Sequence, residues 1–372
     1  MRLRVFRAGT GISILLAVVV LTAMSTGVDY FCLWGPDEPR EAEIARETLE
    51  DGHWITPHLC GLPFLEKPPL YYNLVALSYA LNGKVTSTSA RVVSVLMGLV
   101  MLAATLVLVY RWKGLEAAWL ATFVLMTMPK FWRYSHWILL DIAVGAFCSL
   151  AIVSFALWRF WPPRTIPRQS LLYFLAFFSA CAFLTKGTIA VFHVVVVVGA
   201  FCVVERRGEF FRSAFRPAVT GTFLVPVALW VFLFYRDGGL GYLHEHFVNN
   251  ILGRFLHIPF ALQEVRFHHT DLGNKESWSF YLEVLPEILG PWLLFLPFAL
   301  FEMAKEMRSG FGETRKFFLF LLIWAFVPPI LLSIPAIKER SYILPSYTAY
   351  AVMVAYTICT RNSSMENRWR EG

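Results

Sequence analysis

The stretch WGPDEPREAEIARETLEDGHWITPHLCGLPFLEKPPLYY, Trp34–Tyr72, is highly polar within a chain that is otherwise mostly apolar. It contains eight carboxylates, two histidines, two arginines and one lysine. The whole chain is 57% hydrophobic and 16% charged, whereas a soluble domain carries about 25% charged residues. This contrast predicts a polytopic membrane protein in which Trp34–Tyr72 lies outside the bilayer.

Apolar runs long enough to cross a bilayer recur along the chain. About ten spans are expected, at residues 11–28, 91–110, 115–130, 137–158, 170–184, 188–204, 217–235, 286–304, 317–335 and 342–360. No small-residue cleavage site follows the first run, so we expect a retained span rather than a signal peptide. The predicted fold class is an all-α bundle forming a single domain over residues 1–372.

Basic residues indicate the orientation of these spans. The connections on one side hold 19 of the 33 Lys and Arg residues, against 14 in the longer connections on the other side. The positive-inside bias therefore predicts a cytoplasmic N-terminus and two outer loops, 29–90 and 236–285. The apolar segment Pro69–Gly83 has only 15 residues. Counting it as a span would place every later basic loop on the outer side of the membrane, so we expect a short interfacial or re-entrant helix.

A helix is predicted from Asp37 to Gly52. Acidic residues followed by proline suit a first helical turn, and glycine suits the position that follows a last turn. Ala42, Ala45 and Leu49 share one face, so the helix is expected to lie along the membrane surface.

The carboxylates of this helix have two interpretations. Asp37 and Glu38 either start the helix or form a carboxylate pair that positions a cation or takes a proton from an acceptor. The other glutamates of the helix are expected to form a solvated face: Glu41, Glu43, Glu47 and Glu50.

Lys67 precedes two prolines, which favour extended geometry and present the lysine stiffly before the interfacial helix. It either extends its charge towards water from the membrane edge or holds the phosphate of a lipid carrier.

Several segments resemble one family of integral-membrane glycosyltransferases. GPDEPREAEIARETLEDGHWITPHLCGLPFLEKPPLYYNLVALSYALNG is similar to the N-terminal signature of the family that holds lipid A aminoarabinose transferases and protein O-mannosyltransferases, in the C-type (GT-C) superfamily. Further matching segments follow in order: RYSHWILLDIAVGAF, AFLTKGTIAVF, NNILGRFL, GPWLLFLPFAL and LIWAFVPPILLSIPAIKERSYILPSYTAYAV. The resemblance covers nearly the whole chain.

The resemblance implies transfer of a sugar from a polyprenyl-phosphate carrier, usually with inversion. The acceptor would be a lipid A-like glycolipid or a protein hydroxyl on the outer, periplasmic face of the inner membrane, and no nucleic acid is implied. The implied catalytic carboxylates are Asp37, Glu38 and Asp141. The implied cations for the donor phosphate are Lys67, Arg254, Lys338 and Arg340. Aromatic residues flanking this site are Tyr71, Tyr72, Trp278, Tyr281 and Tyr342.

Glu66 and His246 match positions that hold a divalent metal ion in relatives, which makes a metal cofactor possible here. His193 lies in a span, where a packing role is expected. The central loop lacks a proline usual in the family, which leaves open which of three histidines takes the family position: His257, His268 or His269. Relatives typically continue into a globular outer domain, which is expected to be absent here.

Two other classes remain. A transporter or flippase for lipid-linked sugars would carry ionisable residues at mid-span and paired interrupted helices. An inactive membrane scaffold would keep the fold but would not catalyse the reaction. Charged residues gather instead at the outer ends of the spans, which favours an enzyme.

Overall fold

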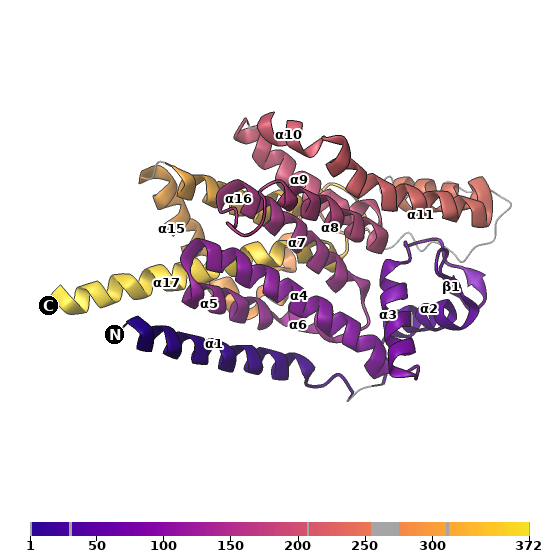
Figure 1. Ribbon diagram of the computed structural model, residues 1–372, viewed down its shortest axis with the longest axis horizontal. Coiled ribbons are helices and arrows are strands. Elements are labelled where there is room, and N and C mark those ends of the chain that lie inside the picture. The colour runs from indigo at the N-terminus through magenta and orange to yellow at the C-terminus, as the bar shows by residue number, and fades with distance from the viewer. Residues whose placement is uncertain (1, 30–31, 207, 254–274, 310–311, 372) are drawn as a thin grey trace.

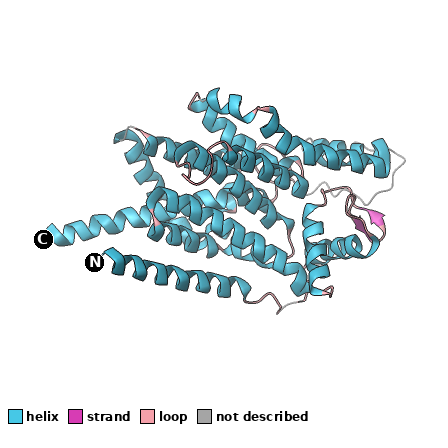
Figure 2. Cartoon of the chain, in the orientation of Figure 1, coloured by secondary structure: helices cyan, strands magenta, loops and turns pink. Residues whose placement is uncertain are grey.

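The computed structural model describes residues 2–29, 32–206, 208–253, 275–309 and 312–371. Figures 1 and 2 show an elongated bundle of helices with a small hairpin and two short helices at one end and both termini at the other. The predicted all-α membrane class is confirmed.

The described bundle consists of helices of very different length. The α-helices are α1 (Arg2–Ser25), α4 (Ser87–Lys113), α5 (Leu115–Met126), α6 (Pro129–His136), α7 (Leu140–Phe160), α8 (Ser170–Lys186), α9 (Thr188–Val204), α10 (Gly208–Ala214), α11 (Pro217–Leu243), α13 (Phe280–Glu283), α14 (Leu285–Leu289), α15 (Leu296–Ser309), α16 (Glu313–Leu332) and α17 (Tyr347–Glu371). A π-helix, η1 (His244–Gly253), continues α11, and two 3₁₀ helices are η2 (Gly290–Phe295) and η3 (Arg340–Ser346).

The predicted spans coincide with apolar helices. Within the described residues, six helical stretches are long and apolar enough to cross a membrane: Ser87–Lys113, Leu140–Phe160, Pro217–Ile251, Phe280–Arg308, Glu313–Leu332 and Arg340–Arg361. Four shorter apolar helices occupy the other predicted places: Gly11–Ser25, Leu115–Met126, Ser170–Lys186 and Thr188–Val204. The chain is a multi-pass membrane protein, and a count of ten crossings stays a prediction.

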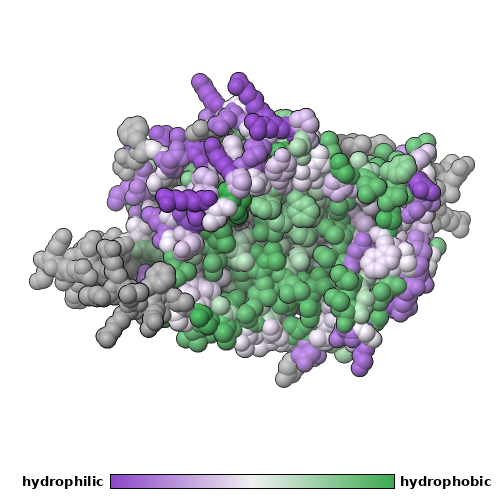
Figure 3. Space-filling model, in the orientation of Figure 1, coloured by the Kyte–Doolittle hydropathy of each residue, from purple (hydrophilic) through white to green (hydrophobic). Residues whose placement is uncertain are grey.

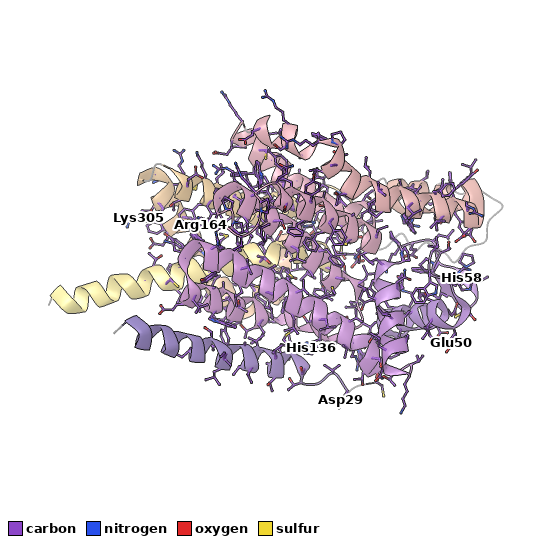
Figure 4. The ribbon with its side chains drawn as sticks, viewed as in Figure 1. Asp29, Glu50, His58, His136, Arg164 and Lys305 are labelled. Carbon is purple, nitrogen blue, oxygen red and sulfur yellow. The ribbon has the colours of Figure 1, made fainter. Side chains whose placement is uncertain are left out.

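The surface has the pattern expected of a bundle in a bilayer. Figure 3 shows a broad apolar area across the middle, with hydrophilic residues gathered towards both ends. Figure 4 places Glu50 and His58 at one end of the molecule, and Arg164 and Lys305 towards the end that holds both termini.

Helix α7 lies at the centre of the bundle, packed against α4, α8 and α9. Its small residues allow close packing, as is usual between membrane helices. A Cβ on Gly145 would lie only 3.0 Å from Leu344 Cγ, so glycine lets η3 approach α7. This contact brings the residues around Tyr342 to the N-terminal part of α7.

The polar stretch folds into a compact unit at one end. It contains α2 (Asp37–Asp51), the antiparallel strands β1 (His58–Leu59) and β2 (Leu62–Pro63), and α3 (Leu70–Asn82), which packs on α2. Gly52 and Gly83 end the two helices with φ of 79° and 65°, in the left-handed conformation that glycine adopts most easily. Both predicted helices are confirmed, and their place at the membrane surface stays a prediction.

One expectation about α2 is wrong. Glu41 and Glu47 are 1% and 3% exposed, so they are not part of a solvated face. Glu47 accepts a hydrogen bond from the backbone N–H of Gly61 at 3.1 Å. The packing of α3 and the hairpin against α2 covers these two glutamates, while Glu43 and Glu50 keep contact with solvent and pair with Arg46.

Candidate active site

A cavity of about 390 Å³ lies between the α8–α9 junction, η1, the end of α16 and η3, and its volume is in the range of small-molecule sites. Its polar lining residues are Glu66, Lys67, Lys186, Thr188, His246, Asn250 and Tyr342. Its other lining residues are Gly187, Ile189, Phe192, Ile251, Leu331, Leu332, Pro335 and Ile337. The cavity therefore combines two cations with a large apolar wall.

Lys67 ends a chain of alternating charges that begins on α2. Its Nζ lies 2.9 Å from Glu41 Oε1. Arg40 Nη2 lies 3.1 Å from the same oxygen and 2.7 Å from Asp37 Oδ1. Burial opposes ionisation of Glu41, but Lys67 and Arg40 outweigh it and hold the pKa of the Glu41 carboxyl below its usual value. Glu41 is thus a buried anion that fixes Lys67 at the cavity.

The second cavity lysine pairs with the predicted carboxylate of α7. Lys186 Nζ contacts Asp141 Oδ1, and the two side chains are 14% and 15% exposed. The same ammonium lies 5.1 Å from the centre of the Tyr342 ring, within the range of a cation–π contact. Lys186 ends α8 and Asp141 begins α7, so two helix ends bring a cation and an anion together beside the cavity.

Lys186 had no predicted role, although the segment AFLTKGTIAVF was matched to the family. An available signal was its position at the end of an apolar helix, where an ionisable residue is costly without a partner.

Both carboxylate oxygens of Glu38 accept hydrogen bonds in the structure. Glu38 is 0% exposed. Arg91 donates to both of its oxygens at 3.0 Å, and the backbone N–H groups of Trp34 and Ile138 donate at 2.8 Å and 3.0 Å. The accepting positions of Glu38 are thus occupied by these donors, and its catalytic role stays a prediction. Its neighbour Asp37 has a side chain that is 52% exposed and stays a catalytic candidate.

The other predicted phosphate-binding cations do not line the cavity where they are described. Lys338 is 6% exposed, and its Nζ donates to the carbonyl of Glu276 at 3.0 Å. Arg340 lies 3.7 Å from Glu287, in an exposed ion pair. Arg254 lies outside the described residues, as do His257, His268 and His269.

The predicted aromatic residues are distributed over different environments. Tyr342 lines the cavity. Tyr71 and Tyr72 are fully buried, and the Tyr71 hydroxyl lies 2.9 Å from that of Ser94. Tyr281 donates to the carbonyl of Glu339 at 3.3 Å, and Trp278 is 77% exposed. Tyr342 is therefore the best placed of the five to contact a substrate in the cavity.

The two residues matched to a metal site line the same cavity. His246 Nδ1 lies 2.8 Å from the carbonyl of Leu65. Because a carbonyl only accepts, Nδ1 carries the proton and Nε2 of the neutral ring is an acceptor. Nε2 is buried and has no hydrogen-bond partner within the described residues, which suits a metal ligand.

The described residues include no group of three metal-ligating side chains, so a divalent metal stays a prediction. Glu66 and His246 would hold it, and it would supply positive charge to a phosphate.

The sequence also matches known proteins. The profile of the family described as dolichyl-phosphate-mannose-protein mannosyltransferase matches residues 4–237. The chain belongs to this family. The chain is 30% identical over 330 residues to the undecaprenyl phosphate-alpha-4-amino-4-deoxy-L-arabinose arabinosyl transferase of Aeromonas salmonicida, covering 87% of this chain and 55% of that protein. It is 27% identical over 347 residues to the transferase of the same name from Serratia proteamaculans, covering 92% and 58%.

Solved structures with a similar fold include ArnT from Cupriavidus metallidurans bound to undecaprenyl phosphate. The TM-score is 0.81 at 22% identity, over 94% of this chain and 60% of that one. The Archaeoglobus fulgidus oligosaccharyltransferase in the apo form gives 0.58 at 14% identity, over 95% and 51%. The predicted glycosyltransferase fold is confirmed, and this member of the mannosyltransferase family spans between half and two thirds of the length of these relatives.

Proposed function

We propose that the protein is a membrane glycosyltransferase that takes a sugar from a polyprenyl-phosphate donor and transfers it to an acceptor outside the cytoplasm. The observation that carries the proposal is the cavity in which Lys67 and Lys186 stand beside an apolar wall. A polyprenyl phosphate complements both features, because its anionic head would face the lysines and its long apolar tail would lie along the apolar wall. The donors and sugars named for the relatives support this choice.

The charges suit the chemistry of this reaction. The bond between the sugar and the phosphate oxygen breaks, and the bond from the sugar to the acceptor oxygen forms. The leaving phosphate gains negative charge, which the ammonium groups of Lys67 and Lys186 stabilise where water is scarce. A carboxylate takes the proton of the acceptor hydroxyl, and Asp37 and Asp141 are the two candidates. Attack opposite the leaving phosphate inverts the configuration of the sugar.

The position of the cavity suits an acceptor outside the cytoplasm. Lys67, which lines the cavity, lies in the segment between β2 and α3. Figure 1 shows α2 and α3 at the end of the bundle away from the N-terminus. With the N-terminus in the cytoplasm, as the basic loops predict, the site faces the outer side of the inner membrane. The acceptor is a glycolipid of the lipid A type or a protein hydroxyl.

The relatives also bear on the sugar. The arabinosyl transferase of Aeromonas salmonicida aligns with 87% of the chain, whereas the mannosyltransferase profile ends at residue 237. We therefore place a pentose of the aminoarabinose kind before mannose as the transferred sugar.

Sugar release from labelled polyprenyl-phosphate donors in proteoliposomes tests this function. Donors carrying aminoarabinose and mannose are compared, with Asp37→Asn beside the wild type. If Asp37 is the base, we expect the rate to fall by about 10²–10⁴-fold, because that is the usual contribution of general base catalysis.

Glu43→Gln is the matched control, since Glu43 is an exposed carboxylate on the same helix that pairs with Arg46. It is expected to keep the wild-type rate. A flippase would move the donor across the membrane without releasing sugar. A folded wild type that releases sugar from neither donor would contradict the proposal.

A further inference from the structure

The buried pair of Glu38 and Arg91 joins parts of the chain that are far apart in sequence. The two side chains are 0% and 3% exposed. Arg91 Nε donates to Glu38 Oε1 and Arg91 Nη2 to Glu38 Oε2, each at 3.0 Å. This two-point contact fixes the plane of the carboxylate as well as its position.

Each partner also forms hydrogen bonds with backbone groups of other segments. Arg91, on α4, donates to the carbonyls of Val28 and Cys32 at 3.3 Å and 3.0 Å. Glu38, on α2, accepts from the N–H of Ile138 at 3.0 Å. The pair thus connects the segment between α1 and α2, helix α4, and the short connection from α6 to α7.

These contacts lie next to both candidate catalytic carboxylates. Asp37 directly precedes Glu38 on α2. Asp141 comes three residues after Ile138, and a hydrogen bond of 2.9 Å from Leu139 N–H to the carbonyl of Trp137 closes a tight turn centred on Ile138. The hydrogen bond from Ile138 to the Glu38 carboxylate therefore directly links the segment that carries Asp37 to the segment that carries Asp141.

Packing alone does not account for these residue types. Taking an ion pair out of water is expensive, and well-packed apolar residues of similar volume often stabilise a protein as much. An ionised carboxylate, however, has enough acceptor sites for a bidentate arginine and two further donors. Glu38 uses these acceptor sites for Arg91 and for the backbone N–H groups of Trp34 and Ile138. An apolar or amide side chain cannot accept all of these hydrogen bonds.

We infer that Glu38 and Arg91 are positioning residues that hold Asp37 and Asp141 at the separation the transfer reaction requires. The inference rests on the proposed transferase function. Neither residue lines the cavity, so the pair acts on the geometry of the carboxylates and leaves donor binding to other residues.

Glu38→Gln and Arg91→Lys, assayed as full-length protein in proteoliposomes, test this inference. The amide introduced by Glu38→Gln keeps one carbonyl oxygen but presents an N–H₂ group where a backbone N–H now donates. We expect kcat to fall by about 10²-fold, because a displacement of about 1 Å can cost that much. The KM for donor and the Kd for undecaprenyl phosphate are expected to stay within about twofold of the wild type, since lost transition-state geometry lowers kcat without weakening binding.

Arg159→Lys is the matched control. Arg159 is a 7% exposed arginine at the other end of α7 that pairs with Glu313 at 2.6 Å. Glu313 is 59% exposed, so this variant is expected to lower the melting temperature less than Arg91→Lys and to leave kcat unchanged. An unchanged kcat there shows that replacing a buried arginine of the bundle does not by itself slow the reaction.

The outcomes separate the two proposals. A folded Glu38→Gln protein with wild-type kcat, or one that loses affinity for undecaprenyl phosphate along with kcat, overturns the positioning role alone. If Glu38→Gln does not fold, Arg91→Lys decides, because it keeps the cation and leaves both backbone N–H donors to Glu38 in place, and an unchanged kcat there also overturns the role. A wild type that transfers no sugar overturns this inference together with the proposed function.

Discussion

Lys67→Ala is expected to lower the rate of sugar transfer by about 10²–10³-fold, the usual effect of removing one preorganised hydrogen-bond donor from a transition state. Lys67 lines the cavity and is held by Glu41 at 2.9 Å. The substitution removes the positive charge that faces the leaving phosphate. Glu41, whose side chain is 2% exposed, then pairs with Arg40 alone. The measurement is kcat and KM with a labelled polyprenyl-phosphate donor.

Two further variants show whether charge at this position matters. Lys67→Arg keeps the charge and is expected to retain more activity than alanine, although a guanidinium does not replace an ammonium group in every geometry. Lys84→Ala removes an exposed lysine that follows α3 and is expected to leave the rate unchanged. Equal rates for Lys67→Ala and the wild type would show that Lys67 has no role in the transfer reaction.

Asp141→Asn is expected to lower the transfer rate by about 10²–10⁴-fold if Asp141 is the base. The substitution keeps the shape of the side chain but removes the charge that faces Lys186. Single-turnover kinetics with bound donor measure the chemical step directly. Activity above a tenth of the wild-type value would assign the base to Asp37 instead.

The pairing of Asp141 with Lys186 gives this prediction its control. Lys186→Gln alone is expected to weaken stabilisation of the phosphate. If the two residues act as a unit, the double variant Asp141→Asn, Lys186→Gln is expected to be about as slow as the slower single variant, because residues of one catalytic unit are strongly non-additive. Fully additive losses would indicate two independent roles.

The helices could be predicted well because their signals are local. A run of apolar residues marks a membrane helix wherever it packs, and Gly52 and Gly83 end α2 and α3 through their own backbone freedom. The prediction that α3 is a short interfacial helix and not a further span rests on the distribution of basic residues along the chain, and it stays a prediction.

The roles of the carboxylates could not be predicted in the same way. Glu38 and Asp37 are neighbours in sequence, yet one is saturated by donors and the other is half exposed. The partner of Glu38 on α4 lies 53 residues away, and its contact at Ile138 lies 100 residues away. Burial of Glu41 and Glu47 depends likewise on how α3 and the hairpin pack onto α2.

By itself the sequence determined the membrane class, the ends of α2 and α3, the family resemblance and the types of residue available for phosphate chemistry. These follow from composition, capping and short motifs, which act over a few residues. The tertiary structure decided which charges pair, and so distinguished the cavity cations Lys67 and Lys186 from Lys338 and Arg340. Pairing depends on the meeting of helix ends such as Asp141 and Lys186, which are 45 residues apart, and only the packing of the bundle determines that distance in space.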